Sequence, residues 1–136
     1  VDGKSKFVKK IVVTTASPHD SKMFPDLMDE SDRGQVAFAD SAYVGQEETL
    51  QKYGLKDEIC EKGYRGNPLT DEQREENRKK SVIRSRVEHV FGFMEGAMHG
   101  LTVRTIGIAR ATAHIFLKCL TYNMFRYEQF VRNGIR

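Results

Sequence analysis

Two carboxylates in this chain are placed where they could share metal-dependent chemistry: Asp40 and Glu88. Asp40 directly follows Val36–Ala39, a short uncharged apolar run that predicts a strand buried on both faces. In open α/β sheets, ligands and catalytic groups gather at the carboxyl ends of such strands. The alternative interpretation is that Asp40 caps a turn with its side chain.

Glu88 lies in a stretch predicted to be helical, four residues after Arg84, so the two side chains share a face and can pair. It is one position from Val87 on the apolar stripe, at the border between core and solvent. Carboxylates on separate elements suit hard cations, which favours Mg²⁺ or Mn²⁺. Two such ions about 4 Å apart would activate a water or a DNA 3′-hydroxyl for in-line phosphoryl displacement. A simple intrahelical ion pair is the structural alternative.

The elements that must position these residues alternate between extended and helical patterns. A strand is expected at Lys6–Thr15, after a turn at Asp2-Gly3, and a second strand at 55–60. Between them, a short helix begins near Asp20 or Ser21 and a second helix, 46–53, ends at a glycine. The first of these helices should bury residues at helical spacing, which are Met23, Phe24, Leu27 and Met28.

Two long helices are expected in the second half of the chain. The capping box Thr70-Asp71-Glu72-Gln73 starts the first, which should continue to Phe91 and end in a glycine-rich stretch. Its core-facing stripe is predicted to be Ile83, Val87, Val90, Phe91, Met94 and Met98. The second helix, 109–131, is expected to bury Ile115, Phe116, Cys119, Leu120, Met124 and Phe125.

Length, composition and charge fit one domain of 136 residues with 39% hydrophobic and 30% charged residues. No apolar run approaches the roughly 20 residues of a membrane helix, so no membrane partner is expected. The two cysteines fit reduced thiols and a cytoplasmic location. The net charge is only +3, but the stretch from Lys62 to Arg86 is rich in Lys and Arg, which suits a polyanion such as DNA. A solvated helix face is the alternative. Neither a zinc spacing nor a disulfide framework is present among two cysteines.

Five short motifs stand in order along the chain: VTTASPHDS (13–21), ADSAY (39–43), RSRVEHVFG (84–92), RTIG (104–107) and YNMFR (122–126). Together they resemble the catalytic domain of bacterial insertion-sequence transposases of the DDE type, insertion-sequence-5 group. The resemblance runs from Val1 to about Arg132. It implies an RNase H-like α/β fold, in which helices flank a mixed sheet. It also implies metal-dependent cutting and joining of double-stranded DNA at transposon ends and target.

The resemblance places the family's second aspartate on Asp40 and its glutamate on Glu88, as catalytic residues and metal ligands. It implies two ions, Mg²⁺ or Mn²⁺, and a nucleoid-associated protein in bacteria, and it is compatible with a homo-oligomer on DNA. Arg84 matches the family's arginine and would position Glu88 or a phosphate. The expected DNA-backbone contacts, with Arg84, are Arg65, Arg78, Lys79, Lys80 and Arg86.

The chain departs from the family pattern at three places. Ser81 and Glu95 stand where the wider group has tyrosine and lysine. No residue matches the first catalytic aspartate, so 1–136 is expected to be the C-terminal part of the domain, lacking its first strand or strands and inactive alone. Two alternatives remain: a non-catalytic DNA-binding or interaction remnant of a transposase gene, and a nuclease of the same fold that cuts without joining.

Overall fold

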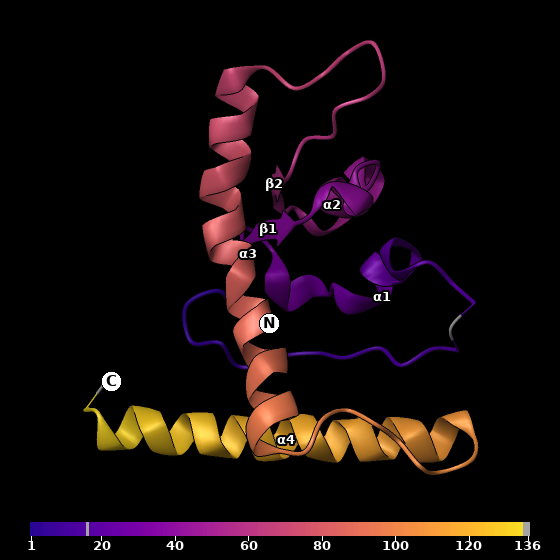
Figure 1. The fold of residues 1–136 in the computed structure, drawn as a ribbon, viewed down its shortest axis with the longest axis vertical. Helices are drawn as coiled ribbons and strands as arrows, with labels where there is room; N and C mark the ends of the chain where they lie inside the picture. Colours follow the sequence, from indigo (N-terminus) through magenta and orange to yellow (C-terminus); the bar gives the residue numbers. More distant parts are fainter. Residues whose placement is uncertain (16, 135–136) are drawn as a thin grey trace. The chain divides into compact units, whose positions relative to one another are not determined.

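The computed structural model describes residues 1–15 and 17–134 and has α/β architecture. Its regions form two compact units: Val1–Ser17 with Arg86–Arg136, and Pro18–Ser85. The elements in chain order are η1 (Asp20–Met23), α1 (Phe24–Leu27), η2 (Glu30–Asp32), β1 (Val36–Ala39), η3 (Ser41–Tyr43), α2 (Glu47–Tyr53), β2 (Lys56–Ile59), α3 (Asp71–Ala97) and α4 (Ile108–Arg132), where η marks a 3₁₀ helix (Figure 1).

The Pro18–Ser85 unit is built on a two-stranded parallel sheet. β1 pairs with β2 in a register that sets Val36 against Lys56 and Ala39 against Ile59. Parallel pairing requires a crossover, and η3 with α2 provide it. A hydrophobic core of Phe24, Leu50 and Ile59 packs beside the sheet. The two strands therefore end at one common edge, immediately before Asp40 and Cys60.

The expectation that the β1 strand is buried on both faces is wrong for this structure. Val36 is 42% exposed, and the other three residues of β1 are only half-buried. The physical reason is that β2 is the only strand paired with β1 in the described part of the chain. β1 therefore has the environment of an edge strand.

Local signals for helix boundaries are confirmed at Gly54 and at Thr70, but not at the start of η1. Gly54 ends α2 in the left-handed conformation, with φ of 62°, where glycine has no Cβ penalty. Thr70 and Gln73 form the expected capping box: the Gln73 amide donates to Thr70 Oγ1 at 3.2 Å, and Thr70 N donates to Gln73 Oε1 at 2.9 Å. At η1 the cap is His19, whose Nδ1 accepts from Ser21 N, and not Asp20 or Ser21. A loop histidine thus has a structural role here.

The second unit has its own core where α3 meets α4. Val90 and Met94 are each 1% exposed and Tyr122 is 5% exposed. Phe93 packs edge-on against Tyr122, with ring centroids 5.6 Å apart. Phe91, predicted to be in the core stripe, is 50% exposed. The stripe is correct at Val90 and Met94, but Phe93 contacts the core in place of Phe91.

The buried face of α4 differs from the predicted one. Tyr122 is its only fully buried residue, whereas Leu120, Met124 and Phe125 are about half exposed or more. Cys119 does pack against the core, as expected. Because apolar residues lie on all sides of α4, helical periodicity could not select the face that contacts the core.

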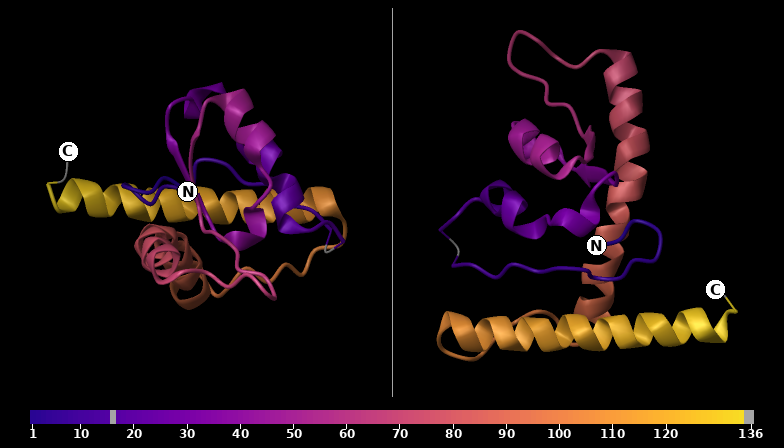
Figure 2. Two further views of the ribbon diagram at one scale, coloured as in Figure 1. Left: turned by 90° about the horizontal axis from the view of Figure 1, so that it is seen from above. Right: turned by 180° about the vertical axis from the view of Figure 1, so that it is seen from behind.

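The segment Lys6–Thr15 is not a strand in this structure, contrary to expectation. It is held to α4, and Figure 2 shows this indigo segment running alongside that helix. Side chains of α4 bond this segment and the residue before it: Asn123 bonds the Val8 backbone, and Arg126 Nε donates to Ser5 O at 2.8 Å. The Asn123 side-chain amide thus makes the two backbone hydrogen bonds at Val8 that a neighbouring strand would otherwise make.

Helices long and apolar enough to span a membrane are not found among the described residues.

Candidate active site and nucleic-acid interface

Asp40 lies at the carboxyl edge of the parallel sheet and is solvent-exposed. It caps η3: its Oδ1 accepts from Ala42 N at 2.9 Å, and its carbonyl accepts from Tyr43 N at 3.1 Å. The capping interpretation is therefore correct. It is compatible with a chemical role, because the cap fixes the carboxylate's direction while leaving it accessible at the edge where α/β proteins bind ligands.

Tyr43 ties this turn to the core. Its ring packs edge-on against Phe24, with centroids 5.8 Å apart. Burial raises the pKa of the Tyr43 hydroxyl above its usual value, and the negative charges of Asp20 and Asp40 raise it further. Tyr43 therefore stays protonated near neutral pH, and Asp40 is attached to a fixed point of the fold.

A pocket of about 280 Å³ opens at the same edge of the sheet. Residues 44–47, which follow η3, line one part of it, and residues between Asp57 and Tyr64 line the rest. Its charged groups are Glu47, Asp57, Glu61 and Lys62. The sequence analysis did not identify this pocket, since its residues become neighbours only through the parallel pairing of β1 and β2.

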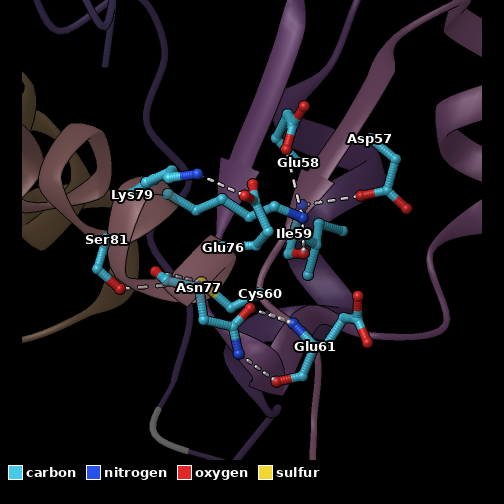
Figure 3. Close-up of polar contacts among 10 residues, drawn as sticks. Asp57, Glu58, Ile59, Cys60, Glu61, Glu76, Asn77, Lys79 and Ser81 are labelled. Carbon is cyan, nitrogen blue, oxygen red and sulfur yellow. Dashed lines mark hydrogen bonds and ion pairs between the residues drawn. The ribbon is translucent and has the colours of Figure 1, made fainter. Parts of the chain in front are cut away.

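Polar contacts fix the start of α3 against the end of β2 (Figure 3). Asn77 Oδ1 accepts from Glu61 N at 2.9 Å, and Asn77 Nδ2 donates to Glu61 O at 3.0 Å. Lys80 Nζ donates to Ile59 O at 3.2 Å and lies 3.3 Å from the Glu58 carboxylate. Lys80 was predicted to contact DNA, but in this structure its ammonium group binds two residues of β2.

The other basic residues on the exposed face of α3 each have an acidic neighbour one turn away. Lys79 bonds Glu76 at 2.6 Å, and Arg78 lies 3.5 Å from Glu75. The hydrogen bond to Glu76 raises the pKa of the exposed Lys79. Both cations remain accessible, so they can contact a phosphate, but their acidic partners reduce the local positive potential.

Arg65 lies at the tip of a tight turn between β2 and α3. Tyr64 and Asn67 exchange two backbone hydrogen bonds of 3.0 Å, and Gly66 takes the positive φ of 89° that the turn requires. Tyr64 is 59% exposed, and Lys62 Nζ lies 5.8 Å from its ring centre. The turn presents two cations and one aromatic ring to solvent, which suits a nucleic-acid backbone and base.

Glu88 belongs to the other unit, where it is exposed on α3 next to the buried Val90. Its neighbour His89 is fixed by Lys6, whose Nζ lies 3.0 Å from His89 Nδ1. Two residues after Glu88, Val90 is 1% exposed in the core of this unit.

The Arg86 side chain forms a hydrogen bond within the same unit. Its Nη1 donates to Gly3 O, in a turn closed by Asp2, whose Oδ1 accepts from Ser5 N and Ser5 Oγ. These bonds lower the pKa of Asp2, the side-chain bond from Ser5 most. Arg86, predicted to contact DNA, therefore has a structural partner. Arg84 is half-buried.

The two candidate metal ligands lie in different units, Asp40 in Pro18–Ser85 and Glu88 in the other. Both are exposed carboxylates, and their hard oxygens suit Mg²⁺ or Mn²⁺. Residues 1–15 and 17–134 contain no group of three or more His, Cys, Asp or Glu side chains that could hold a metal ion. The convergence of Asp40 and Glu88 thus stays a prediction.

Comparisons with known proteins agree with the resemblance to a DDE transposase domain. A family model described as a transposase DDE domain matches residues 1–124. Among curated proteins, the chain is 29% identical over 122 residues to the transposase for insertion sequence element IS1106 of Neisseria meningitidis serogroup B. The aligned region covers 88% of this chain but 42% of that relative, so the chain spans less than half of the relative's length. No solved structure matches.

Proposed function

Because the chain belongs to the family of transposase DDE domains, we propose that it takes part in DNA transposition, by metal-dependent cutting and joining of DNA at transposon ends. The observation that carries this proposal is the position of Asp40: an exposed carboxylate, oriented by a backbone hydrogen bond, at the carboxyl edge of a parallel sheet. The proposal includes an RNase H-like fold, membership of the insertion-sequence-5 group and a place within a longer transposase.

Asp40 and Glu88 are the proposed catalytic residues and ligands of two Mg²⁺ or Mn²⁺ ions. When bound, such ions activate the attacking oxygen and stabilise the leaving oxygen of phosphoryl transfer. The chain's own contribution is to orient the carboxylates: the Ala42 amide holds Asp40, and the α3 backbone anchored at Val90 holds Glu88. Arg84 positions Glu88 or a DNA phosphate.

The DNA backbone is proposed to contact Arg65, Arg78 and Lys79, which are exposed in the structure. Lys80 and Arg86 can join them only by exchanging the contacts that they make within the fold. Electrostatic contacts of this kind give affinity that is independent of sequence and falls with salt. The substrates would be double-stranded transposon ends and target DNA, bound by a homo-oligomer.

Cleavage is proposed to require a longer polypeptide than residues 1–136. The family's first aspartate has no matching residue in this sequence, and two carboxylates provide too few ligands to hold two ions firmly. The longer relative, of which this chain spans 42%, is consistent with that requirement.

The test is to express the longer reading frame and measure Mg²⁺- or Mn²⁺-dependent cleavage and strand transfer on DNA that carries transposon ends. Asp40→Asn and Glu88→Gln should each abolish both products. Asp29→Asn is a matched control, since Asp29 caps η2 through the same carboxylate-to-amide bond, to Ser31 at 2.9 Å. DNA binding without cleavage by the unsubstituted protein would support the non-catalytic alternative, and cleavage without joining would support a nuclease.

A further inference from the structure

The outward face of α4 carries an apolar stripe with the spacing of a coiled coil. Its members follow one another in alternating steps of three and four residues, and they are Leu117, Leu120, Met124, Tyr127 and Val131. Their exposed fractions range from 48% at Leu120 to 65% at Met124. Tyr122, on the opposite face, is buried in the core. A helix that is apolar on both faces is typical of an element covered on both sides.

We propose that this stripe is the interface between two copies of the chain, paired through α4 in antiparallel orientation. A stripe without charge between Ala113 and Tyr127 can pair with itself, and a two-fold axis then makes the same patch serve both copies. The proposal is independent of the DNA chemistry, because it rests only on the exposed face of α4.

Charge selects the antiparallel orientation. Arg110 continues the stripe at its N-terminal end, so a parallel pair would place two Arg110 guanidinium groups against each other. In an antiparallel pair, each Arg110 lies beside Tyr127 and Glu128 of the second copy, where an ion pair and a ring contact are available.

The pairing also sets the rest of the register within the helix. When Leu117 opposes Leu120 of the second copy, Met124 opposes Ala113 and Tyr127 opposes Arg110. Leu117, Leu120, Met124 and Tyr127 are all at least 48% exposed, so the partner helix covers apolar side chains along this length.

The available area is adequate for a stable dimer. The stripe from Ala113 to Val131 extends about 28 Å along the helix. With Phe116 at its border, its exposed side chains offer roughly 700 Å² per copy, close to the roughly 800 Å² per partner of a standard specific interface.

Sedimentation equilibrium of residues 1–136, without DNA, tests the interface from about 1 to about 100 μM. The parent chain should be a dimer in this range. Leu120→Glu introduces two charges into a two-fold interface and should raise the dimer Kd by at least about 100-fold. Val82→Glu is the matched control: Val82 is also apolar and 65% exposed, but on α3, so its substitution should leave the Kd unchanged. Circular dichroism verifies that both variants keep their helices.

Cysteine cross-linking tests the orientation. Under oxidation, Ala113→Cys combined with Met124→Cys should give a covalent dimer, and neither single variant should do so. In a parallel pair, Met124→Cys alone would cross-link. The parent chain with Cys60 and Cys119 gives the background.

A monomer at all concentrations would overturn the proposal, as would a dimer that persists unchanged in Leu120→Glu. Binding of the monomer to phosphatidylglycerol vesicles, abolished by Leu120→Glu, would identify a lipid surface as the occupant and would also overturn it. None of these outcomes depends on DNA cleavage, so the dimer and the transposase activity can fail separately.

Discussion

The side-chain amide of Asn123 holds the backbone of Val8 as a neighbouring strand would. Asn123 Oδ1 accepts from Val8 N at 2.9 Å, and Asn123 Nδ2 donates to Val8 O at 2.9 Å. Asn77 makes the same pair of bonds with Glu61. Each long helix therefore supplies one amide that satisfies the polar groups of an extended segment, in place of a β-ladder.

Asn123→Ala should lower the free energy of unfolding by about 1–3 kcal/mol, because it leaves two half-buried backbone groups without partners. Urea denaturation measures this change, and hydrogen exchange at the Val8 amide should become faster. Thr121→Ala is the control on the same helix: Thr121 is exposed, and its hydroxyl bonds only the Leu117 carbonyl of α4. An equal loss in both variants would contradict the proposed role of Asn123.

Lys80→Met should destabilise the protein by about 1–3 kcal/mol, since it removes a donor to Ile59 O and an ion pair with Glu58 at a side chain only 17% exposed. Methionine retains the apolar stem, so the loss reports the ammonium. Lys79→Met, at a 63% exposed side chain, should leave the denaturation midpoint unchanged. If Lys80→Met and Lys79→Met have equal denaturation midpoints, the Lys80 ammonium contributes no more to stability than an exposed surface charge.

Arg78→Ala and Lys79→Ala should weaken binding to DNA duplexes of unrelated sequence about equally. If each residue contacts one phosphate, the slope of log K against log salt should fall by about 0.9 per substitution. Fluorescence anisotropy over a salt series measures both quantities. Arg33→Ala is the control, because Arg33 pairs with Glu30 at 2.9 Å outside the basic stretch. Unchanged slopes would identify the charges on α3 as a solvated face.

Tyr43 provides a pH-dependent probe of Asp40. The pKa of Tyr43 is raised in the folded protein, first by burial and then by Asp20 and Asp40. A raised pKa contributes stability below the unfolded pKa of about 10, and this contribution is lost as the pH rises through the folded value. Asp40→Asn removes one negative charge and should shift the Tyr43 pKa downward in an NMR titration of ¹³C-labelled tyrosine. Asp29→Asn should have no such effect.

Asp40 and Glu88 should bring their carboxylates within roughly 8 Å of each other when two ions are bound. A crystal structure of the DNA-cutting polypeptide with Mn²⁺ measures the distance and locates the ions by anomalous scattering. Glu95→Gln, two turns from Glu88 on the same exposed face of α3, should retain the ions, whereas Glu88→Gln should lose them. Ions bound without contact to either carboxylate would refute the assignment.

Local features of the fold followed from the sequence alone. The helix start at Thr70 depends on two residues three positions apart, and the helix end at Gly54 depends on one residue's freedom to adopt positive φ. The strands at 36–39 and 56–59 and the two long helices were also expected, whereas the strand expected at Lys6–Thr15 is absent. Asp40 was correctly placed at a strand end for the same reason.

Tertiary structure alone decided which chain segments meet. Periodicity could not identify Tyr122 as the buried residue of α4, because apolar residues surround that helix. Periodicity also could not predict that Asn123 bonds Val8, or that Lys80 in the basic stretch contacts β2. Such contacts join residues more than twenty, and in one case more than a hundred, positions apart. The free energy that selects them comes from burial and hydrogen bonding between whole elements, for which no local residue pattern exists.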